Sequence, residues 1–260
     1  MKRSILTNVQ RQVLEELIAE HGLIVSTQDI LGKIHHKTLA SKHRLIGQLR
    51  QAGWLVRIKN GLYQIADLGS LGALSLSRYT IAQLLLPESY VSFYAALQYH
   101  GLFDQSLSSI SSVSLQQKST VYLEGTTYQF IKTKSAYYYG FGLYAMDGRW
   151  VQIAEIEKAI VDLMQFHRNG TTINFVVELL RDSRHRLQTE QLVAYALRSP
   201  LAVQRSIGFL LDTSGLDASA LAGTAQQSSS LTKLTAESKQ YDSTWRLYYD
   251  PYFVREAVLP

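Results

Sequence analysis

Apolar residues fall on one face of a predicted helix near the start of the chain. Val9, Val13 and Leu17 recur at helical spacing, and this pattern predicts an amphipathic helix from about Thr7 to Glu20. Gly22 favours an end soon afterwards, because glycine readily adopts the backbone conformation found just past a helix C-terminus. The first predicted element is therefore a helix that can bury one face.

A second, shorter helix is predicted over about residues 28–35. Ser26 or Thr27 can cap it with a hydroxyl, and Asp29 suits the positive end of the helix dipole. Residues 35–38 then predict a turn into a third helix, which runs to about Ala52 before Gly53. We expect the third helix to bury one stripe, made of Leu39, Leu45, Ile46, Leu49 and Ala52.

The opposite face of the third helix carries polar side chains at helical spacing, namely Ser41, Arg44, Gln48 and Gln51. Arginine and glutamine read base edges in the DNA major groove, and residues near the start of a recognition helix make such contacts. A solvated surface would use the same residue types. The pattern of this face alone leaves both interpretations open.

A β-hairpin is predicted directly after the third helix. Two β-rich runs, residues 54–58 and 62–65, flank an Asn-Gly pair, which is the strongest short hairpin signal. A basic hairpin in this place is the wing of a winged helix-turn-helix, a DNA-binding module. We expect its tip, with Arg57, Lys59 and Asn60, to touch the DNA backbone or minor groove.

The rest of the chain mixes helical and strand patterns. The sequence therefore predicts an α+β protein, in which an N-terminal winged helix-turn-helix (residues 1–67) precedes a larger mixed α+β C-terminal domain (residues 68–260). Residues 112–134 alternate and predict two or three antiparallel strands. Residues 214–232 are rich in Ser, Ala and Gln and predict a loop. Other strands are predicted at 89–91 and 151–154, and helices at 79–86, 93–100, 155–164, 174–182, 190–197 and 201–211. Residues 244–251 are interpreted as a last strand or a terminal clamp.

Composition and charge narrow the class of protein. The 260 residues include no cysteine, which excludes disulfides and thiolate metal sites and fits a reducing compartment. No apolar run approaches the roughly 18 residues of a membrane span, so we expect a cytoplasmic protein without a membrane partner. Residues 1–66 hold ten of the 26 Lys and Arg but only four of the 21 Asp and Glu. The net positive charge therefore lies in the N-terminal quarter, as expected if that quarter meets a polyanion.

Candidate DNA-binding residues follow from the helix, its turn and the wing. They are the polar and basic residues that can reach bases or phosphates from one side of the predicted module. The set comprises Lys37, Thr38, Ser41, Lys42, His43, Arg44, Gln48, Arg57, Lys59 and Asn60.

Catalytic, metal-binding and cofactor-binding patterns are weak. The chain lacks a G-x-S-x-G motif, and His35 and His36 have no carboxylate at convincing ligand spacing. Glu157 and Lys158 are adjacent rather than separated as in metal-dependent nucleases, so helix capping and dipole complementarity explain the acids here better. We expect no enzymatic activity, no metal and no cofactor.

Two further patterns are interpreted as structural. Residues 140–145 are similar to a G-x-G-x-x-A nucleotide loop but lack a βαβ context, which favours a strand bend with a buried aromatic face. A basic cluster is expected to neutralise a helix C-terminus. It consists of Arg181, Arg184, His185 and Arg186.

Three stretches together resemble a known family. They are KNGLY at residues 59–63, YVSFYAALQYHGL at residues 90–102 and VQIAEIEKAIVDL at residues 151–163. In this order they resemble the AbiEi antitoxins of type IV abortive-infection toxin–antitoxin systems, over roughly residues 5–212. The resemblance implies a bacterial protein that binds double-stranded DNA at its own promoter and represses its operon. It also implies that the C-terminal domain counters a nucleotidyltransferase-like toxin, directly or functionally. The stretch after residue 212 matches no motif.

Two other functions remain open at this point. One is a stand-alone winged-helix transcriptional regulator whose C-terminal domain binds a ligand or a protein. The other is a DNA-acting enzyme that uses the winged helix for targeting. The lack of ligand or nucleophile spacing disfavours the enzyme.

Overall fold

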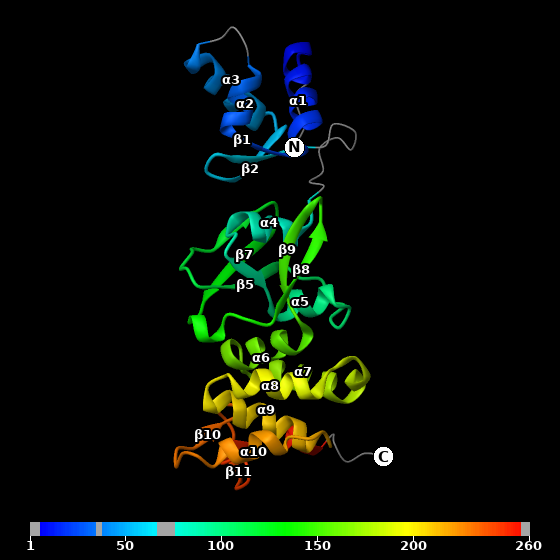
Figure 1. The fold of residues 1–260 in the computed structure, drawn as a ribbon, viewed down its shortest axis with the longest axis vertical. Helices are drawn as coiled ribbons and strands as arrows, with labels where there is room; N and C mark the ends of the chain where they lie inside the picture. The colour runs from blue at the N-terminus through cyan, green and yellow to red at the C-terminus, as the bar shows by residue number, and fades with distance from the viewer. Residues whose placement is uncertain (1–5, 35–37, 67–75, 256–260) are drawn as a thin grey trace. The chain divides into compact units, whose positions relative to one another are not determined.

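The computed structural model describes residues 6–34, 38–66 and 76–255 and confirms the predicted α+β class. The chain divides into two units, residues 1–85 (unit 1) and 86–260 (unit 2), which are drawn in Figure 1. The boundary that the sequence placed between residues 67 and 68 lies within residues 67–75, outside the described part of the chain.

Unit 1 combines four helices and three strands among its described residues. In chain order they are α1 (Asn8–His21), β1 (Ile24–Ser26), α2 (Thr27–Lys33), α3 (Leu39–Gln51), β2 (Leu55–Lys59), β3 (Leu62–Ile65) and α4 (Arg78–Leu85).

Side-chain caps define where the first two helices begin. The Thr7 hydroxyl accepts a hydrogen bond from the Gln10 N–H, and Gln10 Oε1 accepts one from the Thr7 N–H, at 3.3 and 3.0 Å. Ser26 and Asp29 make the same reciprocal pair ahead of α2, at 3.1 and 2.7 Å. These capping boxes satisfy N–H groups that the helix itself leaves unpaired. The predicted cap of the second helix is therefore Ser26 rather than Thr27.

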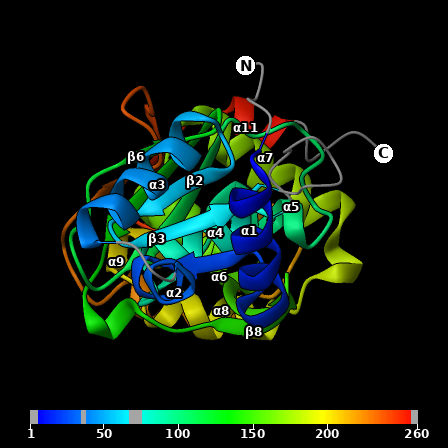
Figure 2. The same cartoon turned by 90° about the horizontal axis from the view of Figure 1, so that it is seen from above.

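The strands of unit 1 form an antiparallel sheet in the order β1-β3-β2. The predicted hairpin is confirmed as β2 and β3, and Gly61 in its turn has a φ of +75°, which favours glycine. The short strand β1 was not predicted. The helices α1, α2 and α3 are arranged around the sheet (Figure 2).

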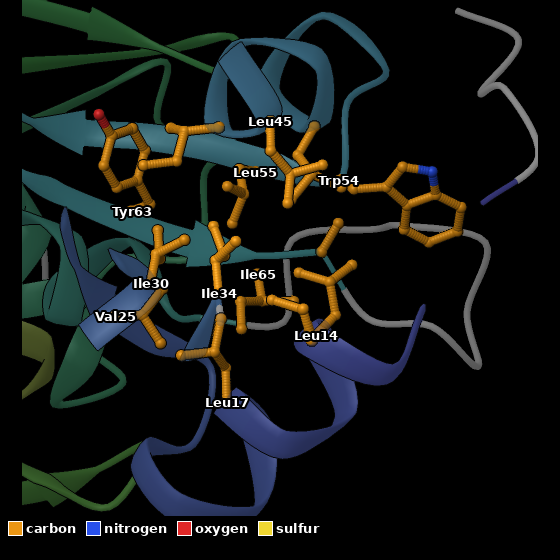
Figure 3. Packing of buried hydrophobic residues seen from close by; sticks show 14 residues of the cluster. Leu14, Leu17, Val25, Ile30, Ile34, Leu45, Trp54, Leu55, Tyr63 and Ile65 are labelled. Carbon is orange, nitrogen blue, oxygen red and sulfur yellow. The ribbon is translucent and has the colours of Figure 1, made fainter. Parts of the chain in front are cut away.

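Apolar side chains from α1, α2, α3 and the sheet meet in one core (Figure 3). Leu14, Leu17, Ile30 and Ile65 are fully buried there. Each such side chain stabilises the fold by about 1.5–3 kcal/mol relative to exposure. The prediction that Leu39 belongs to this core is wrong, because its side chain is 62% exposed. Leu39 is the first residue of α3, whereas the buried residues of this helix, Leu45, Ile46 and Leu49, all lie in its later turns.

Unit 2 is the larger part of the chain. Its elements are β4 (Ser89–Val91), α5 (Phe93–Tyr99), β5 (Ser109–Ser114), β6 (Val121–Leu123), β7 (Thr126–Lys132), the 3-10 helix η1 (Ser135–Tyr137), β8 (Phe141–Met146), β9 (Arg149–Ala154), α6 (Ile156–Phe166), α7 (Gly170–Asp182), the 3-10 helix η2 (Arg184–Arg186), α8 (Thr189–Leu197), α9 (Leu201–Thr213), α10 (Ser219–Ala225), β10 (Thr232–Lys233), β11 (Gln240–Asp242), β12 (Leu247–Tyr249) and α11 (Tyr252–Arg255).

A six-stranded mixed sheet with the order β6-β7-β5-β4-β9-β8 organises unit 2. The expectation that the strands over residues 112–134 are all antiparallel is wrong, because β5 and β7 are parallel. β6 and β7 form a hairpin through Glu124 and Gly125, both at positive φ, and only β7 pairs with β5. The tight turn makes β6 and β7 antiparallel to each other. The longer connection from β5 to β6 allows β7 to run parallel to β5.

Helices α6 to α10 stack in successive layers beside this sheet, and a small sheet of β10, β12 and β11 follows them (Figure 1). The predicted loop over residues 214–232 in fact contains α10. Arg205 of α9 is fully buried and organises this region, because its guanidinium donates hydrogen bonds to the carbonyls of Ala225, Ser228 and Ser230. Trp245 also packs against α9, where its indole N–H donates to Asp212. Residues 225–230 and Trp245 are thus held to α9 by these contacts.

None of the helices in the described residues is both long and apolar enough to cross a membrane.

Candidate nucleic-acid interface

One face of α3 presents polar side chains to solvent. Ser41, Arg44, Gln48 and Gln51 are all exposed, and their spacing places them opposite the buried Leu45 and Leu49 stripe. His43 and Arg50 are exposed as well. Since α3 itself contains no Asp or Glu, every charged side chain on this helix is basic.

The start of α3 is held by two hydroxyls from the predicted set. Thr38 is the N-cap, and its Oγ1 accepts a hydrogen bond from the Ser41 N–H at 3.3 Å. The two hydroxyl oxygens lie 2.9 Å apart and share a further hydrogen bond. Thr38 and Ser41 are therefore engaged in capping, while both side chains remain exposed. Lys37, the predicted residue before them, lies outside the described residues.

Lys42 is directed away from the exposed face. Its ammonium donates a hydrogen bond to the carbonyl of Leu31 at 2.8 Å, near the C-terminal end of α2. A cation at that end complements the helix dipole. Lys42 is half-buried and joins α2 to α3, so its observed role is to position the helix that carries the other candidates.

The hairpin adds basic residues beside α3. Arg57 and Asn60 are exposed, and Lys59 is half-buried. Side chains alternate along a strand, so Arg57 lies on the same face of β2 as Leu55, which packs in the core that α3 covers. A β-bulge between Arg57 and Lys59 shifts the register just before the turn. Since β2 and β3 also lack acidic residues, neither α3 nor the two strands of the hairpin carry a carboxylate side chain of their own.

In unit 2, two sequence motifs meet in a buried polar group that sequence reasoning did not predict. Asp162 Oδ2 accepts hydrogen bonds from the Tyr90 hydroxyl at 3.1 Å and the Ser92 hydroxyl at 2.7 Å, and Oδ1 accepts one from the Lys158 ammonium. We call these four residues the buried quartet, and none of them is more than 1% exposed. They join β4 and the start of α5 to α6. Ser92 is at the N-cap position of α5 but directs its hydroxyl to Asp162 instead of capping the helix.

Burial and charge act on the quartet in opposite directions. Burial raises the pKa of Asp162, and the Lys158 ammonium and the two hydroxyl donors oppose that rise. Burial, followed by the nearby Asp162 carboxylate, raises the pKa of Tyr90, which keeps its hydroxyl protonated as a donor. The Lys158 nitrogen also lies 4.8 Å from the centre of the Tyr139 ring, a cation–π distance. The quartet therefore has the contacts of a structural ion pair.

Capping explains only one of the charged residues discussed at the start of α6, and the helix that is capped is α8. Glu157 Oε1 accepts the N–H of Gln188, the N-cap residue of α8, at 2.8 Å. Glu155 is the N-cap residue of α6, but its carboxylate accepts a hydrogen bond from the Tyr195 hydroxyl at 2.5 Å. Lys158 does not cap a helix and belongs to the quartet.

One member of the basic cluster, Arg186, binds the end of α5 rather than the end of the preceding helix α7. Arg186 donates to the carbonyls of His100 and Gly101, at the C-terminus of α5. The strand bend predicted at residues 140–145 is present, since Gly140 has a φ of +73° and β8 begins at Phe141. Phe141 stacks on the buried Tyr90 ring at 4.7 Å, and the Phe141 side chain is half-buried.

Two surface cavities of unit 2 lie outside the quartet. One has a volume of about 490 Å³ and a floor of three mutually packed rings, Tyr94, Phe103 and Phe175. The other has a volume of about 340 Å³ and lies at the starts of α6 and α8. Residues 6–34, 38–66 and 76–255 include no group of three His, Asp or Glu side chains placed to hold a metal ion.

Comparison with known proteins supports the fold but not a function. No family model and no curated protein matches this chain. Among solved structures, the crystal structure of the RV2827C protein from Mycobacterium tuberculosis is similar, with a TM-score of 0.73 over 99% of this chain and 97% of that chain. The sequence identity between the two is 15%, so the similarity shows a shared α+β fold alone.

Proposed function

We propose that residues 6–66 form a winged helix-turn-helix and that the protein binds double-stranded DNA at its own promoter to repress transcription. The observation that carries this proposal is the exposed face of α3, with Ser41, Arg44 and Gln48 beside the basic hairpin and without carboxylates. The order of α2, α3, β2 and β3 also supports it, because a recognition helix followed by a hairpin is the arrangement of that module.

Each group of residues would have its own part in DNA recognition. Arg44 has the donor geometry to bind a guanine edge in the major groove, and Gln48 suits an adenine edge. Arg57, Lys59 and Asn60 on the hairpin would contact the phosphate backbone and set the orientation of the module. Thr38 and Lys42 would fix the start and the tilt of α3 through their contacts within unit 1.

We further propose that unit 2 counters a nucleotidyltransferase-like toxin encoded beside this gene, which would make the protein a type IV antitoxin. This part rests on the resemblance of residues 90–102 and 151–163 to AbiEi antitoxins. Those two stretches meet in the buried quartet and so belong to one structural unit. The toxin would be opposed by the surface of that unit.

A stand-alone regulator with a ligand-binding unit 2 is the second candidate. The cavity floored by Tyr94, Phe103 and Phe175 favours it, because its aromatic floor and polar rim suit a small organic ligand. Coexpression with the neighbouring gene product separates the two candidates. Rescue of growth supports the antitoxin, whereas no rescue together with promoter repression supports the regulator.

The direct test of DNA binding is a gel shift of the full chain on the DNA upstream of its own gene, at two salt concentrations. We expect Arg44→Ala to weaken specific binding by about 1–3 kcal/mol. We expect Lys59→Ala to weaken binding to all sequences and to reduce the slope of log K against log salt by about one. Arg149→Ala removes the same charge from an exposed position of unit 2 and serves as the control. Equal losses for Arg44→Ala and Arg149→Ala would refute α3 as the reading helix.

A further inference from the structure

The larger surface cavity of unit 2, which we call the aromatic cavity, is formed by α5, the loop after α5, and α7. Its volume is about 490 Å³, and its lining includes Tyr94, Phe103, Gln105, Asn174, Phe175 and Glu178. Pockets that bind small molecules typically measure roughly 300–1,000 Å³, so this cavity is large enough for a small organic ligand. None of the described candidate DNA-binding residues lines it.

The three rings that form the floor of the aromatic cavity are held in place by contacts within unit 2. The ring centres of Tyr94 and Phe103 lie 4.9 Å apart, and the centre of Phe175 lies 5.3 and 5.5 Å from them. The hydroxyl oxygens of Tyr94 and Thr172 share a hydrogen bond at 3.1 Å. The Gln98 side-chain amide donates to a carbonyl of the loop that carries Phe103, at 2.8 Å. Because these side chains are already ordered, a ligand that binds on them has a low ordering cost to overcome.

The same three rings keep part of their surface accessible. Tyr94, Phe103 and Phe175 are each half-buried, whereas Phe93 of α5 and Phe209 of α9 are only 2% exposed. Because the three rings also pack on one another, they present one apolar surface to the cavity. A planar ring placed on this surface removes apolar area from water and makes edge-to-face or offset contacts with the floor. The floor therefore favours an aromatic ligand.

The rim of the aromatic cavity supplies polar groups and one charge. Asn174 and Glu178 lie one helical turn apart on α7. The side chains of Asn174, Glu178 and Gln105 make no hydrogen bond or ion pair with another residue of the described ranges. Glu178 is the only charged residue among the described residues that line the cavity, and the faces of aromatic rings carry a negative potential. The cavity therefore favours a cation and disfavours an anion.

We propose that the aromatic cavity binds a small planar aromatic molecule that carries an ammonium group, as an arylalkylamine does. The ring of the ligand lies on the floor of Tyr94, Phe103 and Phe175, and its ammonium donates to the Glu178 carboxylate. The Asn174 amide offers both a donor and an acceptor to the bound molecule. This ligand class belongs to the second candidate function, the ligand-binding regulator, and the proposal rests on that candidate.

The test is isothermal titration of the full-length protein, without DNA and at low ionic strength, with four probes. Tryptamine has both the aromatic ring and the ammonium. Tryptophol has the same ring with a neutral hydroxyl, indole-3-propionate has the ring with a negative charge, and ethylamine has the ammonium without the ring. We expect saturable binding of tryptamine that is about fivefold or more tighter than that of tryptophol, because the cation gains contacts with the rings and with an exposed carboxylate. Indole-3-propionate and ethylamine should bind more weakly than tryptophol.

Three variants assign the binding to this cavity. Glu178→Gln removes the charge and should weaken tryptamine while it leaves tryptophol unchanged, which a loss of structure would not do. Phe175→Leu keeps an apolar side chain but removes a ring, and should weaken both probes about three- to tenfold. Asn174→Trp fills the cavity and should abolish the binding of both. Glu190→Gln makes the same charge change at an exposed position of α8 and should bind as the unmodified protein does.

Several outcomes would overturn the proposal. They are binding of indole-3-propionate as tight as that of tryptamine, unchanged tryptamine binding in Glu178→Gln or Asn174→Trp, and no binding of tryptamine up to about 10 mM, a concentration at which even a millimolar affinity gives a measurable signal. Far-UV circular dichroism verifies that each variant is folded.

A gel shift on the promoter DNA with and without tryptamine separates the ligand site from the regulator function. A gel shift that changes with tryptamine supports both. Saturable binding of tryptamine with an unchanged gel shift keeps the site and contradicts the regulator. Because the titration contains no DNA, a failure of DNA binding leaves its result intact.

Discussion

Removal of the Asp162 carboxylate should destabilise unit 2 more than most single substitutions would. In Asp162→Ala, the Lys158 ammonium keeps its position at 0% exposure but loses its ion-pair partner, and the Ser92 hydroxyl loses its acceptor. Truncation of one member of a buried ion pair typically costs about 3–5 kcal/mol, because the remaining charge stays buried without compensation. We expect a loss in that range in the free energy of unfolding.

The assay must report on unit 2 alone, because the chain has two units. Trp245 is 2% exposed and packs on α9, so its fluorescence follows the unfolding of unit 2 in a chain whose Trp54 and Trp150 are replaced by Phe. Urea titrations of Asp162→Ala and Asp162→Asn in this background give the two free energies. Asp162→Asn keeps an acceptor oxygen and should lose less than Asp162→Ala.

A double variant tests whether the unpaired charge is the cause. Lys158→Met with Asp162→Leu removes both charges and keeps similar volume, so its loss should be clearly smaller than that of Asp162→Ala alone. A double variant as unstable as Asp162→Ala would refute the argument. It would show that packing or the hydroxyl contacts, and not the ion pair, determine the loss.

Three further predictions follow from single contacts. Lys42→Met should weaken specific DNA binding without changing the slope of log K against log salt in an anisotropy titration, and a slope smaller by about one would instead indicate a phosphate contact. Gly208→Ala should destabilise unit 2 by about 1–3 kcal/mol in urea titrations, because the new Cβ would lie 2.0 Å from the Trp245 ring. Gly223→Ala is the control and should be neutral or stabilising, because no atom lies within 4 Å of its new Cβ. Burial lowers the pKa of His167 below 6.5, because the charged imidazolium is disfavoured inside the protein. The neutral imidazole therefore contributes its full stability above pH 6.5, and this contribution is lost as the pH falls through the lowered pKa. His167→Leu should reduce the difference between the urea midpoints at about pH 7.5 and about pH 5.5, and an unchanged difference would contradict this.

The sequence predicted unit 1 well because its signals are local. The caps at Thr7, Ser26 and Thr38 and the Asn-Gly turn act within three or four residues, so each can be read without knowledge of the rest. β1 escaped prediction because its three residues become a strand only by pairing with β3. The role of Lys42 could have been predicted, since it precedes the buried Ile46 by one helical turn and so lies toward the inner face.

Unit 2 was harder to predict because its polar contacts join residues far apart in the chain. Charge pattern indicated that the cluster around Arg186 caps a helix, but it could not show that this helix is α5, whose last carbonyls lie 85 and 86 positions earlier. Parallel pairing of β5 with β7 is likewise a property of the whole sheet. The Lys158 and Asp162 spacing of four residues within an apolar helix was the one local signal for the buried quartet.

Several residues of the stretches that resemble AbiEi antitoxins are buried, so they bear on the fold rather than on function. Tyr90, Ser92, Lys158 and Asp162 are buried and fasten the sheet to α6, so their presence in another chain favours the same architecture whatever that chain binds. Function must instead depend on exposed neighbours of these residues. At the start of α6, a buried position and a surface position lie close together, because Lys158 belongs to the buried quartet while Glu155, three residues earlier, lines a surface cavity. Substitution at Asp162 therefore tests the fold, whereas substitution at the exposed Arg44 tests the proposed binding role.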